Sequence, residues 1–139
     1  MLGYLAAWIA TAVVFLGLDA IWLSQMGPRL YRPIIGEILA AKVDLGAAVA
    51  FYLMYVSGIV FLAVHPALEK GGLGKAVMMG AIIALFAYGT YDLTNQATLK
   101  VWDVRLTLLD LCWGAFVTSM AAGAGYLAAS RFVGAAPSP

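Results

Sequence analysis

Hydrophobic positions along the chain fall into four long stretches separated by short polar connections. Each stretch has the roughly 20 mostly apolar residues that a helix needs to cross the hydrocarbon core of a bilayer. The stretches occupy about residues 2–24, 45–64, 75–98 and 106–130, and the second ends at His65-Pro66. The pattern predicts an all-α polytopic membrane protein in which residues 1–133 form a bundle of four transmembrane helices and residues 134–139 form a short flexible tail.

The first connection, residues 28–44, has a pattern of its own. Pro33 suits the first turn of a helix, where its missing N–H would be unpaired in any case. Apolar residues after it share one helical face and charged residues fall elsewhere: Ile34, Ile35, Ile38 and Leu39 against Glu37 and Lys42. We therefore expect a short amphipathic helix lying in the membrane interface after the first span, with an ordinary loop as the alternative.

The composition narrows the function classes. Hydrophobic residues make up 64% of the chain and charged residues 11%, against about 45–50% and about a quarter in soluble domains. A soluble enzyme and a disordered chain are therefore excluded. The net charge of +1 gives no electrostatic basis for binding nucleic acid. The first stretch lacks a preceding basic region and exceeds the apolar core of a signal peptide, so we expect it to be retained as a span.

Three of the few charges, Asp19, Asp92 and Asp110, lie inside the predicted spans. A charge within a membrane costs at least a few kcal/mol and by default marks a function or a required partner. Each aspartate is about five or six residues from a span end, which is roughly 7–9 Å. Because successive spans alternate in direction, all three ends belong to the same side of the membrane. The aspartates are therefore expected in one layer.

Two spans share a local pattern around these aspartates. Leu18-Asp19-Ala-Ile-Trp22 in the first resembles Leu109-Asp110-Leu-Cys-Trp113 in the fourth. In each, Asp and Trp are three residues apart and share a helical face. An indole N–H can donate to a carboxylate at interfacial depth.

The third span is the most polar. Tyr88, Asn95 and Gln96 lie three or four residues from Asp92, with Tyr91 beside it, so donors, acceptors and a carboxylate gather on one part of the helix. This density suits a hydrated pocket or a hydrogen-bonded helix contact. Small residues at a spacing of four, such as Gly114 with Thr118 and Ala121 with Gly125, predict close packing of the fourth span.

Two interpretations of the aspartates compete. In a structural interpretation they lock the bundle by pairing with tyrosine and tryptophan donors or with cations of the connections: Arg29, Arg32, Lys100 and Arg105. In a functional interpretation they line a polar cavity open to one side. Neighbouring carboxylates repel each other, so one could hold a proton and serve as a general acid/base or a proton-coupling group.

The remaining candidates are weaker. His65 is expected to cap a span end and Cys112 to pack, because neither has the neighbours of a metal site or a nucleophile. No metal and no cofactor is predicted. Five aromatic residues are interpreted as interfacial anchors: Tyr4, Trp8, Trp22, Tyr31 and Trp102. The first and third connections hold five Lys and Arg against three elsewhere, which weakly favours both termini outside.

Four segments together carry a resemblance to a family. They are LDAIWL at 18–23, YRP at 31–33, YGTYDLTNQATLK at 88–100 and LDLCWG at 109–114. The chain resembles the small bacterial inner-membrane proteins of the family DUF2177. The resemblance implies a multi-pass protein of four helices in the bacterial inner (plasma) membrane, and it names no reaction or ligand.

The leading hypothesis is an intramembrane acidic and polar site that binds or modifies a lipid or a small hydrophobic molecule. Asp19, Asp92 and Asp110 would supply acid/base or proton-coupling groups. Side chains that would orient the bound group are Trp22, Tyr88, Tyr91, Asn95, Gln96 and Trp113, and cations for an anionic head group are Arg29, Arg32, Lys100 and Arg105. Two alternatives stay open: a small proton-coupled transporter acting as a homodimer, and a non-catalytic accessory subunit of a larger membrane complex.

Overall fold

The computed structural model describes residues 1–132, so the tail predicted at 134–139 lies outside the described residues. Within residues 1–132 the chain is almost entirely helical and contains no strand. The elements are α1 (Leu2–Met26), η1 (Gly27–Tyr31), α2 (Arg32–Ile35), η2 (Gly36–Ile38), α3 (Leu45–Ile59), η3 (Val60–Val64), α4 (His65–Glu69), α5 (Gly72–Thr98) and α6 (Val104–Ser130). Four continuous helical runs are long and apolar enough to cross a membrane, which confirms the predicted fold class.

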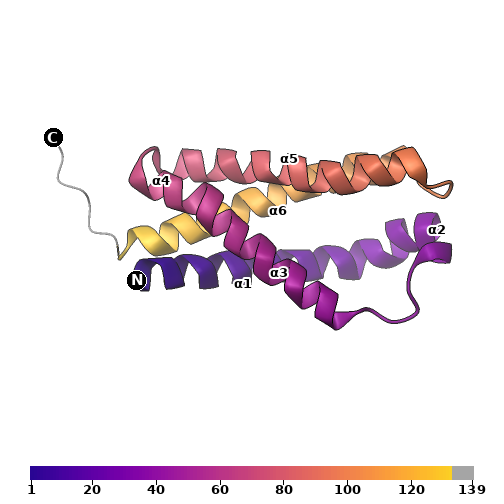
Figure 1. Cartoon of the computed structure of the whole chain (residues 1–139), viewed down its shortest axis with the longest axis horizontal. Coiled ribbons are helices and arrows are strands. Elements are labelled where there is room, and N and C mark those ends of the chain that lie inside the picture. Colours follow the sequence, from indigo (N-terminus) through magenta and orange to yellow (C-terminus); the bar gives the residue numbers. More distant parts are fainter. Residues whose placement is uncertain (133–139) are drawn as a thin grey trace.

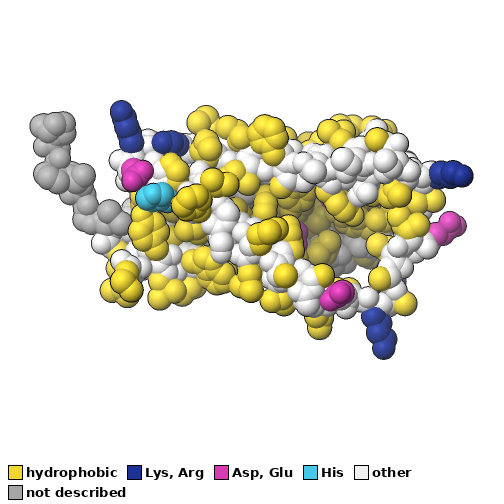
Figure 2. Space-filling view, in the orientation of Figure 1, with side chains coloured by type: hydrophobic (Ala, Val, Ile, Leu, Met, Phe, Trp, Pro, Cys, Tyr) yellow, Lys and Arg dark blue, Asp and Glu magenta, His cyan; other side chains and the backbone are white. Residues whose placement is uncertain are grey.

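The four runs are not equally packed. α6 lies between α1 and α5 and packs along both, whereas α3 crosses the bundle obliquely (Figure 1). The N-terminal half of α3 diverges from the other helices, and α4 at its far end returns to them. On the face shown in Figure 2, apolar side chains cover the middle of the bundle and charged ones lie mostly toward its ends. The outer surface thus suits a lipid environment.

The first helix does not stop where the sequence predicted. α1 continues through η1, α2 and η2 as one helical run, Leu2–Ile38. η1 is a π-helical turn in which the Arg32 N–H bonds the carbonyl of Gly27, and this wider turn accommodates the prolines near the starts of η1 and α2. The helical segment predicted after the first span is therefore present, but it continues α1 instead of standing apart as a separate helix. Only Ile35 of the predicted apolar face is buried, while Ile38 and Leu39 are exposed.

The second helix also runs further than predicted. α3, η3 and α4 form one run, Leu45–Glu69, that passes through His65 and Pro66. η3 is again a π-helical turn, and the His65 N–H bonds the carbonyl of Val60. Pro66 falls in the first turn of α4, where a proline costs little. His65 is thus inside the helix rather than a cap at its end, and its Nδ1 is 2.7 Å from the Tyr4 hydroxyl.

The last two spans begin slightly earlier than predicted. The turn before α5 uses Gly71 and Gly72, whose φ values of 122° and 69° are accessible mainly to glycine. The turn before α6 ends at Asp103, whose carboxylate accepts the backbone N–H of Arg105 at 2.8 Å. The second turn reverses the chain tightly, so α5 and α6 pack antiparallel along their length.

Close packing of α5 on α6 depends on Gly80. A methyl group added there would lie 2.9 Å from the carbonyl oxygen of Thr118 and 3.0 Å from Cα of Ser119. Both atoms belong to the backbone of α6, so neither can turn aside. We expect Gly80→Ala to lower the free energy of unfolding by about 1–3 kcal/mol, the usual cost of overpacking.

Gly17 is the matched control, because nothing lies within 4 Å of a methyl group added there. Gly17→Ala is expected to leave the unfolding temperature unchanged or raise it, since alanine favours the helix by roughly 0.5–1 kcal/mol. Equal unfolding temperatures for the two variants in the same detergent would contradict the tight contact of α5 with α6.

Candidate functional site

Polar and aromatic side chains from several helices surround a cavity of about 370 Å³. Its wall is built by α1, η1, α3, α5 and α6 from Asp19, Leu23, Tyr31, Phe51, Ala87, Tyr88, Tyr91, Asp110 and Trp113. Figure 2 shows the face of the bundle hollowed between α3 and α5, where α3 diverges. The cavity therefore opens sideways, toward the region that lipid would occupy, and carries both predicted carboxylates of α1 and α6.

Asp19 accepts one hydrogen bond on each carboxylate oxygen, from two other helices. Its Oδ2 accepts from the Tyr52 hydroxyl at 2.7 Å, and its Oδ1 accepts from the Trp113 Nε1–H at 3.4 Å. These bonds join α1 to α3 and to α6. Asp19 thus ties α3 and α6 to one side of the cavity.

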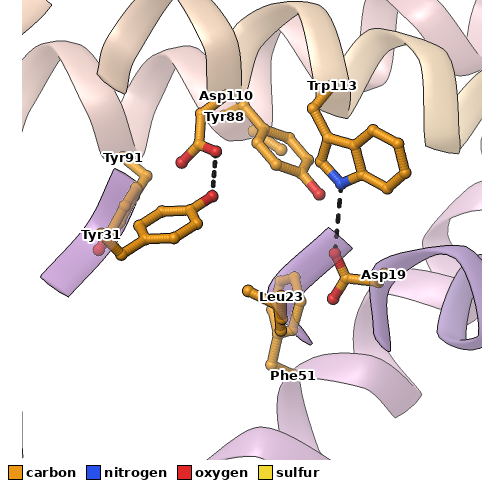
Figure 3. A pocket seen from close by; sticks show the side chains of 9 residues that line it. Asp19, Leu23, Tyr31, Phe51, Tyr88, Tyr91, Asp110 and Trp113 are labelled. Carbon is orange, nitrogen blue, oxygen red and sulfur yellow. Dashed lines mark hydrogen bonds between the residues drawn. The ribbon is translucent and has the colours of Figure 1, made fainter. Parts of the chain in front are cut away.

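Asp110 is more deeply buried, with 4% of its surface exposed. Its Oδ1 accepts from the hydroxyl of Tyr31, and that hydroxyl accepts from the Trp22 Nε1–H at 3.0 Å. Figure 3 shows the Tyr31–Asp110 pair on one side of the cavity and the Trp113–Asp19 pair on the other, with Tyr88 between them. Among the described residues, the second oxygen of Asp110 has no hydrogen-bond partner.

The two Asp-x-x-Trp patterns meet across the antiparallel contact of α1 with α6. Each tryptophan serves the aspartate of the other helix: Trp113 directly, and Trp22 through Tyr31. The indole rings stack with centroids 4.5 Å apart and planes 7° apart. The short sequence match is therefore a reciprocal interaction between helices rather than a repeated motif within each.

Asp92 differs from the other two aspartates. It is fully buried, and neither carboxyl oxygen has a hydrogen-bond partner in the part of the chain that the structure describes. It does not belong to the cavity wall. A buried polar group without a partner is costly, so Asp92 is not a structural lock in this conformation.

The register of α5 on α6 places Asp92 close to the level of Asp110. Asp19 bonds Trp113, which is about one helical turn from Asp110. The three carboxyl groups therefore lie in one layer of the bundle, although only Asp19 and Asp110 face the cavity. The pairs that fix the register of α5 on α6 are Tyr88 with Gly114 and Gln96 with Thr107.

The polar face of α5 divides between two environments. Tyr88 and Tyr91 line the cavity, but Asn95 and Gln96 do not. Gln96 instead accepts a hydrogen bond from Thr107 at 2.7 Å. Both residues lie about one helical turn beyond Tyr91, outside the part of α5 that lines the cavity.

The cations lie outside the cavity. Arg29, Arg32, Lys100 and Arg105 are all exposed, and none forms an ion pair with a carboxylate of the layer in residues 1–132. Arg105 instead bonds Asp103 at 2.8 Å, and these hydrogen bonds hold the pKa of Asp103 at about 2. Pairing of the buried aspartates with these cations is therefore wrong, since long charged side chains at span ends reach toward water. The donors are tyrosine and tryptophan.

Several residues that line the cavity or bond its carboxylates were not predicted from the sequence to do so. Tyr31 was expected to be an interfacial anchor, and Trp22 an anchor or an orienting group; their polar atoms form the hydrogen-bonded chain to Asp110. Phe51, which lines the cavity, and Tyr52, which bonds Asp19, lie in a mostly apolar stretch of α3. The YRP segment that includes Tyr31 did mark the family resemblance, which was the one available signal.

The other predicted groups lie away from this layer. Cys112 is a free, exposed cysteine. His65 is 3.7 Å from Glu69 and contacts Tyr4. In residues 1–132 no three His, Cys, Asp or Glu side chains come together as a set of metal ligands.

Comparisons with known proteins agree with the resemblance. The family described as "Predicted membrane protein (DUF2177)" matches residues 4–127, and so covers every wall of the cavity. No curated protein and no solved structure matches the chain. The match spans nearly all of the described residues, and the chain belongs to the DUF2177 family of predicted membrane proteins.

Proposed function

We propose that this membrane protein binds a lipid or a small hydrophobic molecule in the cavity between α3 and α5. The observation that carries the proposal is the combination of two carboxylates, Asp19 and Asp110, with aromatic and aliphatic walls in a cavity open on the side of the bundle. Binding sites of this kind are mostly apolar with a few placed polar groups. We place the protein in the bacterial inner membrane on the basis of the family resemblance.

The cavity is sized for part of an amphiphile. Its volume of about 370 Å³ is near the lower end of the range for small-molecule sites. A polar group and the first few carbons would fit between Asp19 and Asp110. The rest of an acyl or alkyl chain would leave through the opening lined by Phe51 and Ala87 and remain in the bilayer.

The hydrogen-bonded chain at Asp110 supports acid/base chemistry on such a molecule. Tyr31 donates to Asp110 and accepts from Trp22, so the carboxyl is held in one orientation. A carboxyl fixed beside a bound group can give or take a proton. The same arrangement supports binding alone, and the two differ only in whether the bound molecule changes.

Asp92 favours proton coupling as a second candidate function. A fully buried carboxyl without partners avoids the cost of charge by holding a proton. Proton-coupled transport would then require a homodimer to complete a pathway. An accessory subunit is less well supported, because in a purely structural role the buried aspartates would be paired, and none pairs with Lys or Arg in residues 1–132.

Blocking the cavity tests the leading proposal. Ala87 is exposed at the wall, so Ala87→Trp would fill the opening without crowding a packed contact. We expect native mass spectrometry of the protein, extracted in mild detergent, to find a retained hydrophobic molecule on the wild type and not on Ala87→Trp.

Ala97→Trp is the control, because Ala97 is exposed on the same helix and does not line the cavity. It should retain the same molecule as the wild type. Equal retention by both variants, or no retained molecule on any of them, would contradict the proposal.

A further inference from the structure

The cavity also indicates the chemical class of the molecule it binds. Resting on the function proposed above, we infer that the polar group held at Asp110 is a protonated amine carried on an apolar chain. The inference depends on three features of the described residues: a carboxylate oxygen left without a donor, the absence of cations from the cavity, and its aromatic walls.

The first feature is the free oxygen of Asp110. The side chain is 96% buried, lines the cavity, and receives one donor, from Tyr31 to Oδ1. Asp19 on the opposite wall already has a donor on each oxygen. Oδ2 of Asp110 is thus the carboxylate oxygen of the cavity wall that has no donor, and an N–H or O–H of the bound molecule would satisfy it.

The second feature is charge. No Lys or Arg lines the cavity, and none forms an ion pair with Asp19 or Asp110 among residues 1–132. Buried charges are ordinarily paired. An ammonium group would supply the missing counter-charge, whereas a carboxylate or phosphate would add repulsion. This reverses the expectation that the site holds an anionic head group through Arg29 or Arg32.

The third feature is the aromatic wall. Tyr88, Tyr31, Phe51, Tyr91 and Trp113 surround the space between the carboxylates, as Figure 3 shows. Aromatic faces attract cations, most strongly where water is excluded. The Tyr88 hydroxyl has no hydrogen-bond partner in residues 1–132, so it can accept an N–H from the same ammonium.

A metal ion fits this cavity less well than an ammonium. Cations such as Ca²⁺ require six or more oxygen ligands, and no set of three acidic, His or Cys ligands occurs in residues 1–132. Two carboxylates separated by the Tyr88 ring suit a group with several N–H donors and an attached chain.

The test compares amphiphiles that share one chain and differ in the head group. Dodecylamine, dodecanol, dodecanoate and dodecyltrimethylammonium would be titrated at neutral pH into nanodiscs of a neutral phospholipid that contain the full chain. The apparent Kd follows from the shift in unfolding temperature with concentration. A charge-assisted hydrogen bond predicts that dodecylamine binds at least about tenfold more tightly than dodecanol. Dodecanoate is expected to bind most weakly, and the trimethylated head group, lacking N–H, more weakly than the amine.

Two variants tie the preference to the inferred atoms. Asp110→Asn removes the charge and is expected to weaken dodecylamine binding by about tenfold or more. Tyr88→Phe removes only one hydroxyl and should weaken it less. Asp103→Asn is the control, because Asp103 is a carboxylate outside the cavity and asparagine also caps a helix well. It should bind like the wild type.

The outcomes separate this inference from the proposed function. If dodecanol or dodecanoate binds as well as the amine, and Ala87→Trp abolishes that binding, the cavity binds amphiphiles but the amine inference is wrong. An unchanged dodecylamine affinity in Asp110→Asn would overturn the inference in the same way. If Ala87→Trp leaves the binding of every head group unchanged, the proposed function itself fails.

Discussion

Gly114→Val is expected to lower the stability of the protein and to abolish ligand binding together. A Cβ at this position would overlap the ring of Tyr88, which lies against Gly114 on α6 and also lines the cavity. The ring would have to move into the cavity or push α5 away from α6. We expect the free energy of unfolding to fall by about 1–3 kcal/mol or more, as in other overpacked contacts. Thermal unfolding and amphiphile titration of the same sample would measure both effects.

A second substitution tests the cause of this loss. Adding Tyr88→Ala to Gly114→Val removes the overlap, so the double variant should be more stable than the sum of the two single effects predicts. Gly58→Val is a control, because nothing lies within 4 Å of a Cβ at Gly58. Additive effects at Gly114 and Tyr88 would contradict the contact.

Asp92→Val is expected to stabilise the protein, although it removes one of only seven acidic side chains. Both oxygens of Asp92 are buried without a partner, and such a group costs about 1–3 kcal/mol of desolvation. Valine is apolar and similar in volume, so the free energy of unfolding should rise by a similar amount. Reversible unfolding in mixed detergent micelles would measure the change.

Asp19→Val is the matched comparison and is expected to have the opposite sign. It leaves the Tyr52 hydroxyl and the Trp113 indole N–H without their acceptor. A loss of stability in Asp92→Val as large as that in Asp19→Val would show that Asp92 has a structural partner. That result would remove the basis for proton coupling through Asp92.

The four spans could be predicted from the sequence because hydrophobicity and length alone determine which helices can cross a membrane. The ends of these spans could not be predicted in the same way. Pro66 was expected at the end of the second span and Pro33 at the start of a separate helix, but the π-helical turns η1 and η3 allow the helices to continue past them. Such turns depend on packing with the rest of the bundle, and no local pattern of residues specifies them.

The candidate site was predictable only in part, for a related reason. Asp19 and Asp110 stand out because charge is rare in a membrane span. Their partners are remote in sequence: Tyr31 is 79 residues from Asp110, and Tyr52 is 33 residues from Asp19. Which tyrosine reaches which carboxylate depends on how α3 and η1 pack against α6. The placement of the cations follows from hydration at the span ends, which outweighs attraction to a buried carboxylate.

The central claim is that the cavity between α3 and α5 holds the polar end of an amphiphile at Asp110. An experimental structure of the protein purified with native lipid retained tests it most directly. We predict density between Asp19 and Asp110 within hydrogen-bond distance of Oδ2 of Asp110, continuing past Phe51 and Ala87 to the outer surface. A cavity closed by the side chains of Phe51 and Tyr91, with lipid bound only on the outer faces of the helices, would contradict the account.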